Sequence, residues 1–292
     1  MTMSKRHPNS SSSNNHKNLS HFFLPEQAFS KAGEHGSGQI ASLVELEDAA
    51  TAHQLIHVLR LEQGDSVKLL DGLGNMWQAK ICRMARSLVT FELSELLADA
   101  RTTSQSKCQV ISMLPLLKGP RFEWALEKLT ELNVDRIIPF STTRTVVKTK
   151  GKEENEGRQK RWQNIIKEAA EQCERLLLPI LDQPITLADL LKLEDTDSSK
   201  TTLKLLLSER DQAPTLVQYL EPIITNSASL DSRASFRISL LGGPEGGFTE
   251  EEKELISNSA FQNVSLGSTI LRGETAAILA AGIAYAIAST LD

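Results

Sequence analysis

Between residues 105 and 292, short apolar runs alternate with longer segments whose apolar positions recur every three or four residues. The runs are typical of buried strands, and the periodic segments are typical of amphipathic helices. This alternation predicts an α/β fold, in which a mostly parallel sheet is covered by helices on both faces. KGKEENEG (150–157) is expected to be a charged loop, and the segment after residue 209 a weak helix. The expected strands lie at 108–117, 134–140, 202–209, 235–243 and 263–267, and the main helices at 119–133, 158–176, 249–261 and 274–291.

Residues 21–100 show a different pattern, with several short strands and one helix. This pattern favours a small β-barrel, an architecture that often binds RNA, although a fold alone does not establish a function. Residues 1–20 are polar, low in complexity and free of acidic residues, which predicts disorder; an organelle transit peptide shares this composition. The expected elements are a strand at 21–29, a helix at 48–60 capped by Asp48, a hairpin at 65–81 that turns at 71–75, and a strand at 87–96.

Two glycine-bearing connections lie between expected strands and helices. LLGGPEGGFTEEE (240–252) has four glycines in six residues, followed by Thr249 and Glu252 at the spacing of a helix capping box. Open α/β sheets bind ligands at the carboxyl ends of their strands, so bare backbone here indicates a ligand site. A tight turn with incidental glycines is the alternative. LGSTILRGETAA (266–277) is the second connection and is expected to form the other wall of the same pocket, whereas neither a P-loop nor a G-x-G-x-x-G motif is present.

Composition narrows the class of protein. The 292 residues are 40% hydrophobic and 24% charged, as in globular proteins. The longest apolar stretch, Thr275–Leu291, is too short for a confident membrane span, and three scattered cysteines argue for a reducing compartment without zinc or disulfides. The segment 101–180 carries 15 basic and 10 acidic residues in a chain whose net charge is −5. That excess is typical either of a solvated helical face or of a phosphate-binding stripe.

The paired motifs GGPEGGFTEEE and LGSTILRGETAA resemble those of the SPOUT, or α/β-knot, methyltransferases, and more narrowly those of the bacterial 16S ribosomal RNA uridine-N3 methyltransferase family. Other segments resemble this family in the same order along nearly all of the chain from residue 21. They are HFFLPE, HVLRLEQGD, LLDGLGNMW, KGPRFEWALEKLTELNV, RTVVK and EAAEQCER.

The resemblance implies a PUA-like RNA-binding barrel at 21–100 and a trefoil-knotted SPOUT domain at 105–292. It further implies S-adenosylmethionine as cofactor, no metal, a cytoplasmic homodimer, and 16S ribosomal RNA or the small ribosomal subunit as partner. The implied cofactor loops contain Gly243, Pro244, Glu245, Gly246, Gly247, Leu266, Gly267, Ile270, Leu271 and Arg272. The implied RNA-binding residues are Lys118, Arg121, Arg144, Lys148 and Arg175.

Uracil N3 would attack the methyl carbon of the sulfonium directly and displace the thioether sulfur, with Arg272 stabilising the uracil oxygens or a phosphate. A surface ion pair between Arg272 and Glu274 is the alternative. Glu245 either contacts the cofactor or caps its own turn. Glu168, Gln172 and Arg175 are expected on one helix face, where they either serve RNA or form an internal hydrogen-bond network.

The chain departs from the family at three positions, where Thr269, Gly273 and Asn133 replace the usual arginine, threonine and glycine. Thr269 removes a positive charge from a loop near the RNA, and Gly273 is expected to loosen its loop. Two other functions remain open: a SPOUT enzyme that acts on transfer RNA, and an RNA-binding protein without catalytic activity.

Overall fold

The computed structural model describes residues 19–29, 42–99, 107–145, 152–193, 200–209, 212–230 and 235–290. The chain divides into two compact units. The first comprises Met1–Leu69 and Trp77–Leu97, and the second comprises Leu70–Met76 and Ala98–Asp292. Disorder is predicted for residues 1–20, of which residues 1–18 lie outside the described residues.

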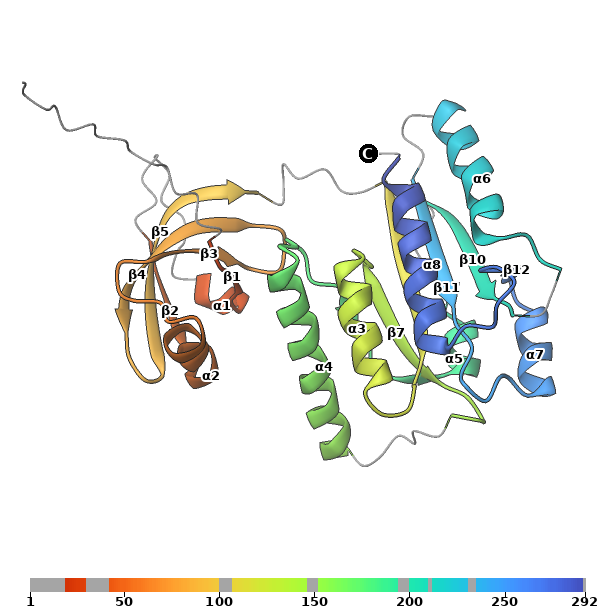
Figure 1. Cartoon of the computed structure of the whole chain (residues 1–292), viewed down its shortest axis with the longest axis horizontal. Coiled ribbons are helices and arrows are strands. Elements are labelled where there is room, and N and C mark those ends of the chain that lie inside the picture. The colour runs from red at the N-terminus through yellow and green to blue at the C-terminus, as the bar shows by residue number, and fades with distance from the viewer. Residues whose placement is uncertain are drawn as a thin grey trace, which may run out of the picture. The chain divides into compact units, whose positions relative to one another are not determined.

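The first unit is a curled five-stranded sheet with strand order β1-β3-β4-β5-β2 (Figure 1). Its buried core gathers side chains from all five strands and from the helical segment, among them Phe22, Leu55 and Phe91. Strand β2 was not predicted, although Val44 and Leu46 are buried and alternate with exposed neighbours at the period of a strand. The elements are β1 (His21–Phe23), α1 (Glu26–Phe29), β2 (Ser42–Glu47), α2 (Ala49–His53), a π-helical turn (Gln54–Val58), β3 (Ser66–Leu70), β4 (Met76–Met84) and β5 (Leu88–Ala98).

Local side-chain bonds explain two predicted features, the helix cap of the first unit and the hairpin turn at 71–75, which belongs to the second unit. Asp48 begins the helix, because its carboxylate accepts hydrogen bonds from the Thr51 amide at 2.9 Å and from the Thr51 hydroxyl at 2.6 Å. Asp71 closes the β3–β4 turn, since its Oδ1 accepts from the amides of Leu73 and Asn75. The predicted cap and the predicted hairpin are therefore confirmed, whereas the helix expected to continue to residue 60 ends in the π-helical turn.

The second unit is the expected parallel α/β domain. Its sheet has the order β12-β10-β11-β6-β7-β8, with β9 paired to β7, and each of these pairings is parallel. The strands are β6 (Cys108–Pro115), β7 (Arg136–Ser141), β8 (Ile180–Leu181), β9 (Ile185–Thr186), β10 (Thr201–Leu207), β11 (Phe236–Leu241) and β12 (Gln262–Val264). The helices are α3 (Arg121–Glu131), α4 (Lys152–Gln172), α5 (Leu187–Leu191), α6 (Leu216–Leu230), α7 (Glu250–Ser257) and α8 (Gly273–Ala288).

Helices cover both faces of this sheet. On one face α4, α3, α8 and α6 lie side by side, and they enclose a core that includes Leu126, Trp162 and Ala281 (Figure 1). On the other face α5 and α7 pack over a smaller core that contains Phe140 and Ile256. Because β11 pairs with both β6 and β10, and β10 pairs with β12, the loops that follow these four strands leave the same edge of the sheet. The two glycine connections are therefore neighbours.

Several sequence predictions need correction. The segment 150–157 is not wholly a loop, because α4 begins at Lys152; its lysine and glutamate residues are good helix formers. The short elements β8, β9 and α5 were missed, since none exceeds five residues. The apolar, small-residue-rich sequence of α8 predicts a helix buried nearly all round, but α8 is buried only along its alanine-rich face, and Leu279 and Tyr285 are 40% and 42% exposed. Among the described residues, no helix is both long and apolar enough to cross a membrane.

Asn133 stands where the end of α3 requires a left-handed backbone, with φ of 57°. The Asn133 amide donates to the carbonyl of Thr130, and the Val134 amide donates to that of Leu129, each at 3.1 Å. These two bonds form a Schellman motif, which usually places glycine at this position and sometimes asparagine. The replacement of the family glycine by Asn133 is thus explained by the tolerance of asparagine for left-handed geometry.

Candidate functional site

The two glycine connections lie against each other at the carboxyl edge of the sheet. A Cβ atom added at Gly273 would stand 3.2 Å from the carbonyl oxygen of Gly243 and 3.1 Å from the side chain of Leu117. Such distances are tighter than ordinary side-chain contacts, so glycine at position 273 allows close approach. Gly273 therefore joins the loops rather than loosening its own, contrary to the expectation for this position.

Within the loops, Gly247 and Gly267 have φ of 67° and 127°. Residues other than glycine rarely adopt this geometry, so these two glycines set the course of the backbone. The turn from Pro244 is closed by a hydrogen bond from the Gly247 amide to the Pro244 carbonyl at 2.9 Å. Pro244 is buried, whereas Gly246 and Gly247 are exposed, so bare backbone faces outward at this turn.

The capping box predicted at Thr249 is present. The Glu252 amide donates to the Thr249 hydroxyl, and the Thr249 amide donates to Glu252 Oε2 at 2.9 Å. The other oxygen of the buried Glu252 accepts from the amide and the hydroxyl of Thr143. The box therefore also fixes the turn to the loop that follows β7. The motif spacing could reveal the cap but not the bond to Thr143.

Glu245 and Glu274 converge on one guanidinium. Arg121 Nη1 lies 3.1 Å from Glu245 Oε1, and Arg121 Nε lies 3.7 Å from Glu274 Oε1. Glu274 is 4% exposed, and its Oε2 is a buried oxygen without a hydrogen-bond partner among the described residues. The suggested capping of its own turn by Glu245 is replaced by the pair with Arg121. Arg121, which was expected to bind RNA, contacts both loops from the start of α3.

Arg272 is the N-cap residue of α8, with extended backbone and an exposed side chain. No hydrogen bond or ion pair to its guanidinium is found within the described part of the chain, and Glu274 pairs with Arg121 instead. The surface ion pair that was the alternative role of Arg272 is thus absent there. Of the large apolar residues expected in the second cofactor loop, Ile270 is 62% exposed, whereas Leu266 and Leu271 are partly buried.

The remaining basic candidates have different surroundings. Arg144 is exposed, and its Nη1 donates to the carbonyls of Gly246 and Phe248 at 3.0 and 3.3 Å. It therefore braces the glycine turn that begins at Pro244. Lys118 is exposed in the loop that follows β6. Lys148 lies outside the described residues.

Arg175 is not placed to bind phosphate. It follows the end of α4 rather than sharing a helix face with Glu168, and its guanidinium donates to the carbonyls of Thr130 and Val134 at 3.0 and 2.8 Å. Burial lowers the pKa of Arg175, while the nearby Asp135 carboxylate acts in the opposite direction. The alternative of an internal hydrogen-bond network is therefore the correct interpretation of Arg175, and we withdraw it from the RNA-binding set.

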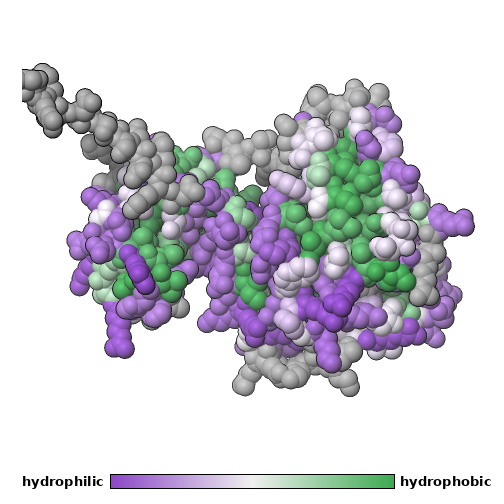
Figure 2. Space-filling model, viewed as in Figure 1, coloured by the Kyte–Doolittle hydropathy of each residue, from purple (hydrophilic) through white to green (hydrophobic). Residues whose placement is uncertain are grey.

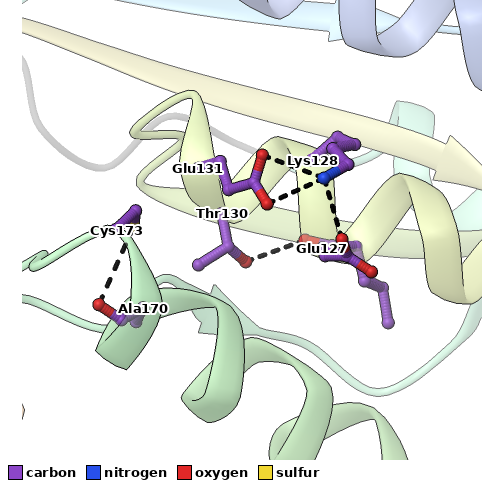
Figure 3. Close-up of polar contacts among 7 residues, drawn as sticks. Glu127, Lys128, Thr130, Glu131, Ala170 and Cys173 are labelled. Carbon is purple, nitrogen blue, oxygen red and sulfur yellow. Dashed lines mark hydrogen bonds and ion pairs between the residues drawn. The ribbon is translucent and has the colours of Figure 1, made fainter.

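Among the 15 basic residues in 101–180, Lys128, Arg136 and Arg161 pair with neighbouring carboxylates. At the end of α3, Lys128 lies between Glu127 and Glu131 (Figure 3), and hydrogen bonds, first to Glu127 and then to Glu131, raise its pKa. Arg136 pairs with Asp182, and Arg161 pairs with Glu123. Exposed pairs of this kind contribute little stability, but they remove charge from a phosphate stripe. Among the described residues of this segment, Lys128, Arg136 and Arg161 thus favour the solvated-face interpretation.

A cavity of about 540 Å³ opens beside the turn, between the end of β7 and the first turns of α5 and α7. Its hydroxyls bond to neighbouring protein groups: Thr142 to Thr145, Thr143 to Glu252 and Thr186 to Asp189. Because these groups already have partners, we place the candidate site at the glycine loops and not in this cavity.

Comparison with known families agrees with this fold and site. Residues 104–285 match the family model described as an RNA methyltransferase domain, and residues 46–94 match an RNA methyltransferase PUA domain. The fold and the site thus define an RNA methyltransferase with an N-terminal PUA domain.

The curated relatives narrow this class. The chain is 34% identical over 231 residues to ribosomal RNA small subunit methyltransferase E of Synechocystis sp., an alignment that covers 79% of this chain and 69% of the relative. The enzyme of the same name from Rickettsia conorii is 30% identical over 240 residues, with 82% and 88% covered. The chain belongs to the ribosomal RNA small subunit methyltransferase E family, and the resemblance read from the glycine motifs is confirmed.

Solved structures show the same relationship. A putative methyltransferase from Legionella pneumophila, in complex with the bound cofactor SAM, superposes with a TM-score of 0.73 at 30% identity, covering 92% of this chain and 97% of that one. Ribosomal RNA small subunit methyltransferase E from Neisseria gonorrhoeae, bound to S-adenosyl methionine, gives 0.68 at 27% identity, with 90% and 95% covered.

Proposed function

We propose that this protein transfers the methyl group of S-adenosylmethionine to N3 of a uridine in 16S ribosomal RNA of the small ribosomal subunit. The observation that carries the proposal is the meeting of two glycine loops at the carboxyl edge of a parallel sheet, in a chain of this family. The family relationship supports an RNA methyltransferase, while the choice of uracil N3 rests on the motif resemblance.

The residues of the two loops suit an adenosyl ligand. Gly247 and Gly267 are exposed and carry no side chain, so their backbone groups can form hydrogen bonds with a nucleoside edge, whereas the Gly246 carbonyl already accepts from Arg144. Leu266, Ile270 and Leu271 provide apolar surface on which adenine can lie. When bound, S-adenosylmethionine supplies a methyl group on a positively charged sulfur. Gly243, Pro244, Glu245, Gly246, Gly247, Leu266, Gly267, Ile270, Leu271 and Arg272 are the residues that would hold it.

Arg272 is the catalytic candidate. Uracil N3 must lose its proton to become a nucleophile, and the resulting negative charge is shared with the two carbonyl oxygens, O2 and O4. The exposed guanidinium of Arg272, which has no partner among the described residues, can donate hydrogen bonds to an oxygen that gains charge. N3 lies on the Watson–Crick edge, so the target base must be unpaired or flipped out of its stack. No side chain is assigned as the proton acceptor.

RNA binding is proposed for both parts of the chain. The PUA-like domain, residues 21–100, would hold the RNA, and the methyltransferase domain, residues 105–292, would modify it. Lys118 and Lys148 are the candidates for phosphate contacts in the second domain. Arg144 would act chiefly through the turn that it braces.

A homodimer is proposed through α8. Leu279 and Tyr285 are exposed on this helix, and Figure 2 shows apolar residues gathered on the surface where α8 lies. An apolar helix face is a typical subunit contact. Tyr285→Asp should shift sedimentation from dimer to monomer, and a wild-type chain that sediments as a monomer would contradict the proposal. The trefoil threading of the second domain and a cytoplasmic location remain predictions.

Two measurements test the proposed function. Titration calorimetry with S-adenosylmethionine should show binding, whereas an RNA-binding protein without catalytic activity should give no heat. Incubation with radiolabelled S-adenosylmethionine should then label naked 16S ribosomal RNA or small subunits. Digestion of the labelled RNA to nucleosides identifies the nucleoside that carries the methyl group. Label in transfer RNA alone, or in a nucleoside other than 3-methyluridine, would contradict the proposal.

A further inference from the structure

Arg121 occupies the point where three loops meet. It is the first residue of α3 and follows the loop that leaves β6. Strand β6 lies beside β11, and the Gly242 amide donates to the carbonyl of Met113 at 3.2 Å, so the glycine turn begins next to this loop. The same guanidinium faces Glu245 in the turn and Glu274 in the first turn of α8.

The placement of Arg121 is unfavourable for its own helix. The N-terminus of a helix carries partial positive charge, so arginine in the first turn is electrostatically misplaced. Its N-cap residue, Pro120, provides no side-chain cap. The carboxylates of Glu245 and Glu274 supply the compensating charge, and the planar guanidinium can address both because Nη1 and Nε point along different edges.

Glu274 has the greater need of this contact. Its side chain is only 6% exposed, and a buried carboxylate is costly unless a positive charge is close. Gly273, its chain neighbour, is packed against the Gly243 carbonyl, so an unpaired charge at Glu274 would act directly on the junction of the two loops. Arg121 is therefore a tie between the loops whose removal leaves a buried charge uncompensated.

We propose that Arg121 is a positioning residue of the cofactor site. By compensating the buried charge of Glu274 at the junction of the two glycine loops, it keeps these loops in the geometry that ligand binding requires. This inference rests on the proposed function. It replaces the expectation that Arg121 binds RNA phosphate, because the Nη1 and Nε edges of its guanidinium are both directed at carboxylates.

The experiment compares full-length variants by titration calorimetry with S-adenosylmethionine. Arg121→Ala should weaken binding about tenfold or more, because the Glu274 carboxylate is left buried and unpaired. Adding Glu274→Gln removes that charge and should restore affinity to within about threefold of wild type. Arg121→Lys, which keeps the charge but reaches only one carboxylate, should fall between.

Arg136→Ala is the matched control. Arg136 has the same side-chain exposure as Arg121, 43%, and pairs with Asp182 at 2.8 Å, but it begins β7 at the opposite edge of the sheet. Its removal should leave cofactor affinity unchanged. Thermal unfolding without cofactor provides a second readout, in which Arg121→Ala should melt lower than the Arg121→Ala/Glu274→Gln double variant.

The outcomes are distinct. Restoration by Glu274→Gln, with an unchanged salt dependence of RNA binding in Arg121→Ala, supports the positioning role. Normal cofactor affinity in Arg121→Ala together with a flatter salt dependence would make Arg121 a phosphate contact and overturn it. Weakened affinity that Glu274→Gln does not restore would also overturn it. Failure of the proposed function would show separately, as a wild-type chain that does not bind S-adenosylmethionine, and the unfolding comparison would still decide the role of Arg121.

Discussion

Gly246 is the position at which a small change should have the clearest effect on the cofactor turn. A Cβ atom added there would stand 3.1 Å from Arg144 Cβ and 3.6 Å from the Arg144 carbonyl oxygen. Valine adds two further methyl groups, so Arg144 must move away. Its hydrogen bonds to the carbonyls of Gly246 and Phe248 would then be lost. Gly246→Val should therefore prevent the turn from holding the shape that binds the cofactor.

The magnitude follows from the cost of overpacking. Extra carbon atoms in a fitted site typically cost about 1–3 kcal/mol. Rotation of the Arg144 side chain moves neither its Cβ atom nor its carbonyl oxygen, so the loop that follows β7 must shift before the turn can take the shape that binds the ligand. One tenfold change in affinity corresponds to about 1.4 kcal/mol. The dissociation constant for S-adenosylmethionine should therefore increase by a factor between about 5 and about 150. The lost bonds of Arg144 add little, because its side chain is exposed.

The assay is titration calorimetry with S-adenosylmethionine, with circular dichroism to verify that both units remain folded. Gly157→Val is the matched control, since a Cβ at Gly157 in α4 would meet no atom within 4 Å. That control should bind the cofactor as the wild type does. Near-normal affinity in Gly246→Val would refute the reasoning and remove this turn from the cofactor site.

Three further predictions concern catalysis, RNA and stability. Arg272→Ala should keep cofactor affinity within a few-fold but slow single-turnover methyl transfer on the order of 100-fold, since a donor to developing charge is lost; a normal rate would make Arg272 structural. Lys118→Ala and Lys148→Ala should each lower the log–log salt slope of RNA binding by about one, and an unchanged slope would exclude phosphate contacts. Asn133→Val should lower the free energy of unfolding in urea by about 1–2 kcal/mol, because valine resists positive φ. Asn133→Gly should not lower it, and equal stability of the two variants would contradict the Schellman cap.

Periodicity and motif spacing could predict much of the fold. The five main strands of the second domain are apolar runs, and helix α7 begins at a capping box, so both are specified by residues close together in the chain. Strand β2 was equally readable from its alternation but was overlooked. The beginning of α4 could not be predicted in this way, because a run of charged residues suits either a helix or a loop.

The site was predictable only where backbone was its main component. The two glycine motifs indicated bare loops at strand ends, and the structure brings them together. The partners of the charged side chains could not be predicted, since Arg121 and Glu245 are 124 residues apart and Arg175 meets its carbonyl partners more than 40 positions away. A basic residue in a sequence shows its charge but not whether that charge faces RNA, a carboxylate or the end of a helix.

The central claim, methylation of uridine N3 in 16S ribosomal RNA, is tested most directly by mass mapping of that RNA from cells with and without this protein. The account predicts one fragment that is heavier by a methyl group only when the protein is present, with the added mass on uracil as 3-methyluridine. Restoring the wild-type chain, but not Gly246→Val, should restore that mass. Identical 16S ribosomal RNA maps from the two cells, or a methyl group lost from transfer RNA instead, would contradict the account.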